Sequence, residues 1–158
     1  MSEAGVVVVV GVDGSPGSAA ALEFAVQDAL RRRARLRVVA VVPLADYWGG
    51  WRGTAAAYTG RWPAPPEDLM ANARSQAQRM VDEVAADRTP LVSVDVEAVA
   101  GGPAPVLLDA AEGADLLVLG HRGRGAFSSV VLGSVGLQCV LHATCPVTVV
   151  RPTVVAED

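Results

Sequence analysis

The chain has 158 residues, of which 51% are hydrophobic and 19% charged, and its formal net charge at pH 7 is −4. These values favour one globular domain with its own core and exclude an intrinsically disordered chain. The negative charge also argues against nucleic-acid binding, which needs a basic face. The apolar run at 5–12 is too short to span a bilayer and follows Glu3 rather than a basic segment, so we expect a cytoplasmic protein with no membrane partner.

The first half of the chain alternates strand and helix patterns. The continuous apolar run Val6–Gly11, rich in β-branched residues, predicts a strand buried on both faces. Ser15 and Pro16 then supply an N-cap and a first-turn proline, and apolar residues at helical spacing continue the helix to the arginines at 31–33. A second apolar run over 36–42 predicts the next strand.

The second half continues this alternation. The predicted elements are a helix that begins at 66–68 and ends before Pro90, strands over 91–99, 115–119 and 147–151, a helix over 103–112 and a helix that opens at Ser134. Strands alternating with helices predict an α/β fold: an open, doubly wound, five-stranded parallel sheet flanked by helices on both faces. We expect one domain over 1–158, with a short C-terminal tail at 152–158.

A glycine-rich segment directly follows the predicted strand at 115–119. It begins at Gly120 and Gly123, and after nine further residues Gly133 and Ser134 open a helical stretch. Small residues let the backbone approach a ligand and point N–H groups at it, and a helix start offers unpaired N–H groups to an anion. The loop at 11–14 also follows a strand, so both segments are predicted to face one crevice at the carboxyl edge of the sheet.

The lysine and cysteine content of the chain further restricts the kinds of binding site and catalysis that it can support. All thirteen basic residues are arginine, which excludes a Walker A loop and Schiff-base catalysis, because both need lysine. Neutralisation of a phosphate would therefore come from arginine, backbone N–H groups or a metal. Cys139 and Cys145 lack the spacing of a zinc site, and we expect buried, reduced thiols, with a redox pair as the alternative.

Three segments, in this order, resemble the universal stress protein family. Gly120-x2-Gly123-x9-Gly133-Ser134 matches the family's ATP-binding signature in every spacing, while residues 9–15 resemble its first strand and loop and residues 142–150 its usual ending. The likeness covers residues 6–151. It implies a single-domain member of the ATP-binding branch, with the Rossmann-like, adenine nucleotide alpha hydrolase-like fold and a homodimer that forms through the last strand, Val147–Arg151.

The resemblance also implies roles for individual residues. Asp13 would contact the adenosine, and the backbone near Val41 would read the adenine edge. Gly11, Val12 and Val135 would form the pocket walls. The ribose and triphosphate would be held by Gly120, Gly123, Gly133 and Ser134, and the candidate binding set is completed by the loop residues His121, Arg122, Arg124 and Gly125.

Two residues depart from the family's usual pattern. His121 stands where Ser or Thr is more usual, and we interpret it as a side chain at the pocket rim that can titrate near neutral pH. Gly136 stands where Ser often follows, which removes one hydroxyl contact to phosphate. For Arg122 and Arg124, a counter-charge for phosphate and a solvated loop charge remain equal alternatives.

The segment from Pro43 to Pro66 is rich in aromatic residues. It holds five of the seven in the chain: Tyr47, Trp48, Trp51, Tyr58 and Trp62. Three interpretations stay open, namely a lid over the nucleotide, a docking surface for a partner or second subunit, and a loop that packs its aromatic side chains on a neighbouring helix.

The sequence predicts a nucleotide-dependent regulatory protein that binds ATP, with Mg²⁺ accompanying the phosphates, and acts by binding rather than turnover. The first alternative is a slow ATP hydrolase or a phosphoryl- or nucleotidyl-transfer enzyme with His121 or Asp13 in proton chemistry. The second is a structural dimer with a non-functional site. A dinucleotide site is disfavoured because the glycines at 11, 14 and 17 lack the Gly-x-Gly-x-x-Gly spacing.

Overall fold

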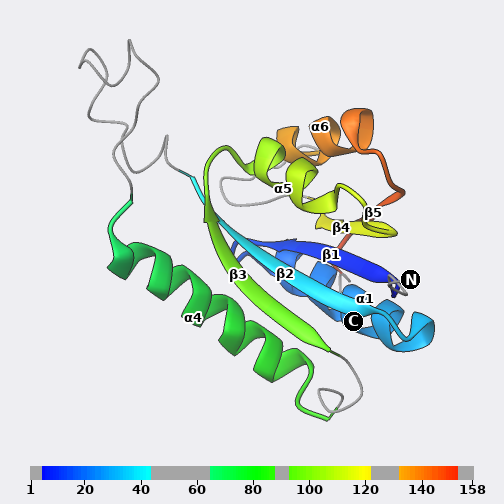
Figure 1. The fold of residues 1–158 in the computed structure, drawn as a ribbon, viewed down its shortest axis with the longest axis horizontal. Helices are drawn as coiled ribbons and strands as arrows, with labels where there is room; N and C mark the ends of the chain where they lie inside the picture. Colours follow the sequence, from blue (N-terminus) through cyan, green and yellow to red (C-terminus); the bar gives the residue numbers. More distant parts are fainter. Residues whose placement is uncertain (1–4, 44–64, 88–92, 122–131, 153–158) are drawn as a thin grey trace, which may run out of the picture.

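The computed structural model describes residues 5–43, 65–87, 93–121 and 132–152. Its elements, in chain order, are β1 (Val7–Val12), α1 (Pro16–Arg32), β2 (Arg35–Val42), α4 (Glu67–Val84), β3 (Val94–Ala100), α5 (Pro103–Ala111), β4 (Leu116–Gly120), α6 (Ser134–His142) and β5 (Val147–Val150) (Figure 1). Each lies where the alternation predicts it. The start of β3 differs, since Ser93 precedes the strand and the predicted residues 91–92 lie outside the described ranges.

The five strands form one parallel sheet in the order β3-β2-β1-β4-β5, which confirms the predicted fold class. The chain builds outward from β1 through β2 to β3 and then returns to the other side of β1 with β4. The direction of winding therefore reverses between β1 and β4. In open α/β sheets, ligands bind at this switch point, beyond the carboxyl ends of the strands.

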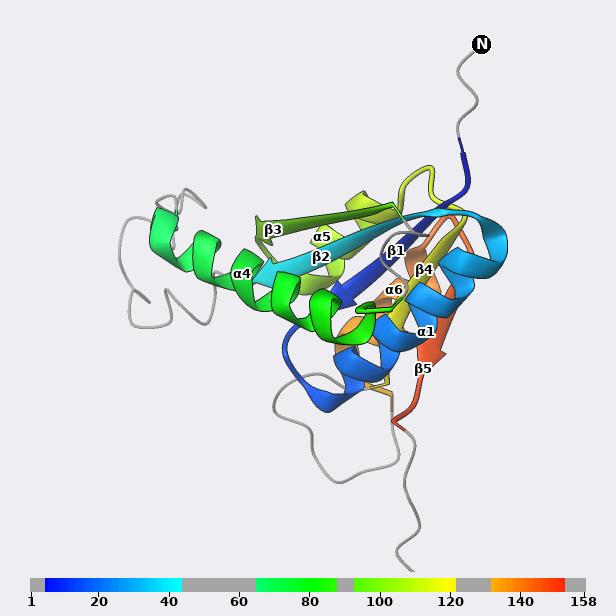
Figure 2. The same ribbon diagram turned by 90° about the horizontal axis from the view of Figure 1, so that it is seen from below.

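Two helices cover each face of the sheet (Figures 1 and 2). On one face, Val8 and Val10 of β1 pack in a cluster with α1 and α4, and on the other face Val9 packs with α5 and α6. Because successive strand residues point to opposite faces, a run of valines buries β1 on both sides. This is why the central strands read as continuous apolar stretches.

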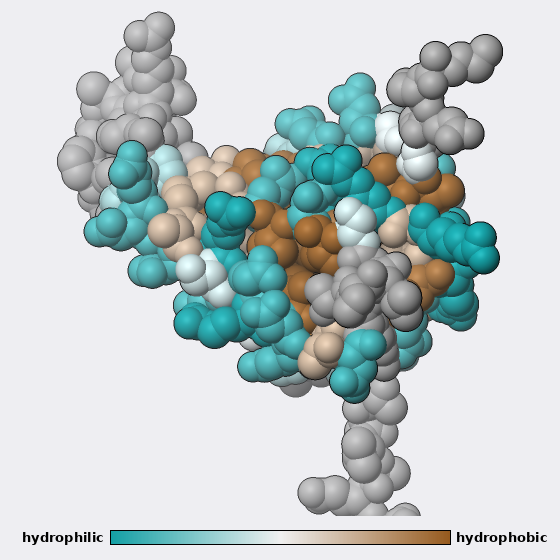
Figure 3. Space-filling view, turned by 60° about the horizontal axis from the view of Figure 1, so that its bottom comes forward, coloured by the Kyte–Doolittle hydropathy of each residue, from teal (hydrophilic) through white to brown (hydrophobic). Residues whose placement is uncertain are grey.

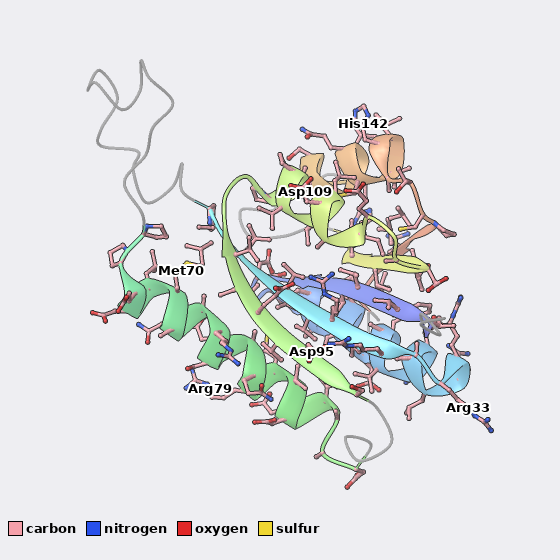
Figure 4. All side chains as sticks on the ribbon, viewed as in Figure 1. Arg33, Met70, Arg79, Asp95, Asp109 and His142 are labelled. Carbon is pink, nitrogen blue, oxygen red and sulfur yellow. The ribbon has the colours of Figure 1, made fainter. Side chains whose placement is uncertain are left out.

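Helix α1 is closed at both ends by local hydrogen bonds. Its N-cap is Ser15, as predicted, and the Ser15 hydroxyl accepts a hydrogen bond from the Ser18 N–H at 3.2 Å. At the other end Arg33 adopts a left-handed φ of 55°, and the Arg33 and Ala34 N–H groups donate to carbonyls of the last turn. Arg33 projects from this end into solvent (Figure 4). The helix thus leaves few backbone groups for other partners.

The outer surface of the α1 and α4 side carries hydrophilic side chains around a more apolar centre (Figure 3). Within the described ranges, no helix is both long enough and apolar enough to cross a membrane.

Candidate functional site

The carboxyl ends of β1 and β4 lie side by side in the middle of the sheet. Val10 pairs with Val118, so the same register places Val12 level with Gly120. The sequence prediction that the loop after the first strand and the start of the glycine-rich segment share one edge is therefore confirmed for the described residues. This edge is also the switch point of the fold.

Asp13 is held in place by the loop that follows β1. Its Oδ1 accepts a hydrogen bond from the Ser15 N–H at 2.9 Å, an Asx-type turn that leads the chain into α1. Gly14 has a φ of 81°, in the left-handed region that glycine adopts without strain. Asp13 therefore has a structural role in shaping the loop, where its side chain is half-buried.

Gly120 allows β4 and α1 to meet backbone to backbone. A Cβ at this position would lie 2.7 Å from both the carbonyl carbon and the oxygen of Gly17, and 3.1 Å from the Ser18 nitrogen. No real Cβ approaches a backbone this closely, so the first turn of α1 would have to move. The signature glycine is thus required by helix packing as well as by any ligand, a role that sequence reasoning missed. Gly17, a second small residue in that turn, is the signal that could have revealed it.

Gly11 has a different neighbour. A Cβ here would lie 2.8 Å and 3.0 Å from the two methyl carbons of Leu107 on α5, and 3.4 Å from a methyl of Leu119. These contacts are side-chain atoms, which can shift more readily than backbone. The absence of a side chain at Gly11 therefore lets Leu107 of α5 pack closely against β1.

The two ends of the glycine signature are joined by one backbone hydrogen bond, and a second bond connects the same residue, His121, to β5. The Gly133 N–H donates to the His121 carbonyl at 3.2 Å, and the His121 N–H donates to the Val150 carbonyl at 2.8 Å. The structure thus brings Gly120, His121 and Gly133 together at the end of β4. The intervening candidate residues Arg122, Gly123, Arg124 and Gly125 lie outside the described residues, as does most of the aromatic segment, so their roles stay predictions.

The start of α6 contrasts with that of α1. Its N-cap is Gly133, with φ of −60° and ψ of 157°, and within the described residues no side chain caps the first turn. Among the described residues, the N–H groups of this turn therefore have no side-chain acceptor, and they stand at the positive end of the helix dipole. A phosphate is the kind of group that such a helix start binds.

Val12, a predicted wall residue, packs in the cluster on the α1 and α4 side, whereas Val41, predicted to read the adenine edge, and the wall residue Val135 lie on the α5 and α6 side. Val41 and Val135 are half-buried and both pack against the cluster of Val39, Leu107 and Leu119. The register of β1 and β2 pairs Val12 with Ala40, so Val41 lies one residue further along than the end of β1.

Two shallow hollows have similar volumes, about 390 and 380 Å³. The first lies between the start of α1 and α4, beside Gly14. The second includes Arg35 and Arg37 at the amino end of β2, where each guanidinium is already paired, with Asp95 and Glu97 of β3 respectively. Volume does not distinguish the two hollows, but the paired arginines make the second a poor site for an anion.

Comparison with known proteins decides the family. The model of the universal stress protein family matches residues 7–151. This chain belongs to the universal stress protein family. A universal stress protein of Mycobacterium tuberculosis is 37% identical over 154 residues, an alignment that covers 91% of this chain and 47% of that protein. The chain therefore spans about half the length of the curated relatives it matches.

Solved structures of universal stress proteins share the fold. UspA from Lactobacillus plantarum is 26% identical, with a TM-score of 0.64 and coverage of 92% of this chain and 97% of that one. A universal stress protein in complex with cAMP is 23% identical (TM-score 0.58, coverage 96% and 100%), and one from Archaeoglobus fulgidus in complex with dAMP is 18% identical (TM-score 0.51, coverage 92% and 97%). At the last two identities, the likeness shows the fold alone.

The two cysteines of this universal stress protein are both free thiols. Cys139 on α6 is buried, Cys145 before β5 is half-buried, and burial raises the pKa of each thiol. The prediction of a buried, reduced thiol therefore holds fully for Cys139. No three His, Cys, Asp or Glu side chains gather into a metal-binding group in the part of the chain that the structure describes.

Proposed function

We propose that this universal stress protein binds ATP at the carboxyl edge of the sheet and acts through binding rather than turnover. The observation that carries the proposal is the meeting of the loop after β1 with both ends of the glycine signature at the switch point. The loop after β1, the end of β4 and the uncapped start of α6 lie together there, with Gly133 bonded to His121. Such an arrangement presents backbone donors to phosphate where the fold places ligands.

In this proposal each candidate residue has a defined part. The phosphates accept hydrogen bonds from the first turn of α6, at Ser134 and Val135, and from the glycine segment that begins at Gly120. Asp13, fixed by its bond from Ser15, accepts from a donor group of the adenosine. Mg²⁺ enters with the triphosphate, on phosphate oxygens and water, since that is how Mg²⁺ is commonly bound with nucleotides.

Two structures of the same family were obtained with the adenine nucleotides cAMP and dAMP, which supports an adenine nucleotide here as well. Binding without turnover is supported by the candidate set itself. Its titratable side chains in the described part are Asp13 and His121, and Asp13 is already engaged with a backbone N–H. The alternative of a slow hydrolase or transferase would require one of these two to activate water or another nucleophile.

We also propose that the protein forms a homodimer through β5 and resides in the cytoplasm. Strand β5 pairs with β4 on one side and is the last strand in the sheet order, and within the described ranges no strand pairs with its other edge. The two free thiols fit a reducing compartment.

The proposal is tested by calorimetric titration of nucleotide-stripped protein with Mg-ATP, followed by phosphate release from the same sample. We expect micromolar binding, about −8 kcal/mol at 1 μM, with negligible release. Gly123→Val should abolish binding and leave the fold intact, because it adds a side chain within the signature. Gly5→Val is the matched control, since a Cβ at Gly5 meets nothing within 4 Å. Equal ATP binding by Gly123→Val and the parent would show that the proposed site is wrong.

A further inference from the structure

Arg151 lies at the carboxyl edge of the sheet, directly after the last residue of β5, Val150. It is exposed, and no hydrogen bond or ion pair joins its side chain to another residue of the described ranges. Within these ranges the N–H donors of its guanidinium therefore have no protein acceptor.

Backbone hydrogen bonds place Arg151 close to the start of α6. The Val150 carbonyl accepts from the His121 N–H at 2.8 Å, and the His121 carbonyl accepts from the Gly133 N–H at 3.2 Å. The register of β4 and β5 pairs Gly120 with Val150, so Arg151 is level with His121, one residue further along. Arg151 is thus the next residue after the strand end to which the N-cap of α6 is linked.

The alternation along β5 places Arg151 on the same side of the sheet as α6. Val147 packs against the cluster on the α5 and α6 side, whereas Val150 packs against the cluster on the α1 and α4 side. Successive residues of an extended chain point to opposite faces, so the next position, Arg151, returns to the α6 side. Pro152 follows it, and a residue before proline favours the extended backbone that this alternation requires.

The other arginines of the described ranges are paired or lie elsewhere. Ion pairs with carboxylates hold Arg31, Arg32, Arg35 and Arg37. Positions away from the start of α6 are taken by Arg33, at the end of α1, and by Arg74 and Arg79, on the helix α4 that covers the other face. Helix α6 itself contains no Asp, Glu, Arg or Lys, and the chain has no lysine. Among the described residues, Arg151 is therefore the arginine best placed to meet an anion at the start of α6.

We propose that Arg151 binds the phosphates of the nucleotide through its guanidinium, as a fixed counter-charge beside the first turn of α6. The inference rests on the proposed function and deepens it, because the backbone N–H groups of that turn carry only partial charge. Arginine stays protonated at neutral pH, and its planar fork can donate to two phosphate oxygens at once.

The test is calorimetric titration of nucleotide-stripped protein with Mg-ATP. Arg151→Gln removes the charge, and we expect the dissociation constant to rise at least about tenfold, since hydrogen bonds to charged groups are the strong ones. Arg151→Lys keeps the charge and should bind ATP more tightly than Arg151→Gln. Arg33→Gln is the matched control, because it removes the same charge from another exposed arginine, at the end of α1, and should bind like the parent. Circular dichroism of each variant shows that the fold is retained.

The outcomes separate this inference from the proposed ATP site. Equal ATP affinity of Arg151→Gln and the parent overturns the role of Arg151 and leaves the ATP site standing. An equal loss in Arg33→Gln overturns it too, because the effect would then come from net charge, and so does an Arg151→Lys variant that binds no better than Arg151→Gln.

A parent that binds no ATP is titrated with inorganic tripolyphosphate. Binding of this anion that weakens in Arg151→Gln supports the role of Arg151 while the nucleotide proposal fails. Absence of binding to either probe, or tripolyphosphate binding that Arg151→Gln leaves unchanged, overturns both.

Discussion

Helices α1 and α6 both begin beside the carboxyl ends of β1 and β4, yet they differ in the capping of their first turns and in burial. The start of α1 is capped by the Ser15 hydroxyl, and its first turn is buried against Gly120. The start of α6 follows Gly133 without a side-chain cap among the described residues, and its outer face is exposed. On this contrast α1 serves as scaffold, and α6 is the helix to whose start we assign the phosphates of the proposed ligand.

We expect the largest effect, on the free energy of unfolding, from a substitution where α1 contacts β4. Gly120→Ala places a Cβ 2.7 Å from the Gly17 backbone, so α1 must move away from β4. We expect a loss of about 2 kcal/mol in the free energy of unfolding, measured by urea denaturation. Gly5→Ala, whose Cβ meets open space, controls for the change of residue type. Equal midpoints for the two variants would show that the close approach of α1 to β4 carries no energetic weight.

A substitution at the start of α6 should change the affinity for Mg-ATP instead. Gly133 has an extended backbone that any residue adopts, so Gly133→Asp supplies a cap and a negative charge at the start of α6. We expect Mg-ATP affinity to fall at least tenfold, about 1.4 kcal/mol, because the carboxylate occupies the place of a phosphate. Calorimetric titration measures this, with Gly133→Ser as an uncharged cap for comparison. Unchanged affinity in Gly133→Asp would place the phosphates elsewhere.

Removing the cap of α1 should give a smaller change, in stability. Ser15→Ala deletes the oxygen that accepts from the Ser18 N–H, and we expect a loss of about 1 kcal/mol. Thermal or urea unfolding measures the difference. A loss no larger than that of an exposed substitution such as Ala71→Ser would mean that the cap adds little and that the contrast between the two helix starts is weaker than their geometry suggests.

We expect the smallest effect on the pH dependence of stability, through the Cys139 thiol of α6, a group that α1 lacks. Burial raises the pKa of Cys139, so the folded protein retains this proton to higher pH than the unfolded chain. The resulting stability is fully present below the ordinary thiol pKa of about 8.5 and is lost as the pH rises through the raised value. The stability difference between the parent and Cys139→Ala should therefore shrink between pH 8 and 10, as measured by urea unfolding. A difference that stays constant across this range would contradict the expectation.

The fold was predictable because its signals are local. β-branched runs mark strands buried on both faces, and Ser15-Pro16 marks the start of α1, so both follow from neighbouring residues. The meeting of the β1 and β4 ends was also predictable, since parallel strands deliver their loops to one edge. The packing roles of Gly11 and Gly120 were not, because each depends on a residue distant in sequence, Leu107 or Gly17.

The exposure of α6 could not be predicted for a similar reason. Leu137, Val140 and Leu141 read as an ordinary apolar helix stretch, and nothing in their spacing says which of them the rest of the chain covers. Burial is decided by the elements that pack over a helix, here α5 and the sheet on one side only.

The backbone of His121 bonds in two directions at once. Its N–H holds the carbonyl of Val150 on the edge strand, and its carbonyl holds the N–H of Gly133 at the head of α6. His121 thus connects the edge strand β5 to the start of α6 through two backbone hydrogen bonds. In the proposed function, a ligand that displaces the head of α6 would therefore also act on β5 through these two hydrogen bonds.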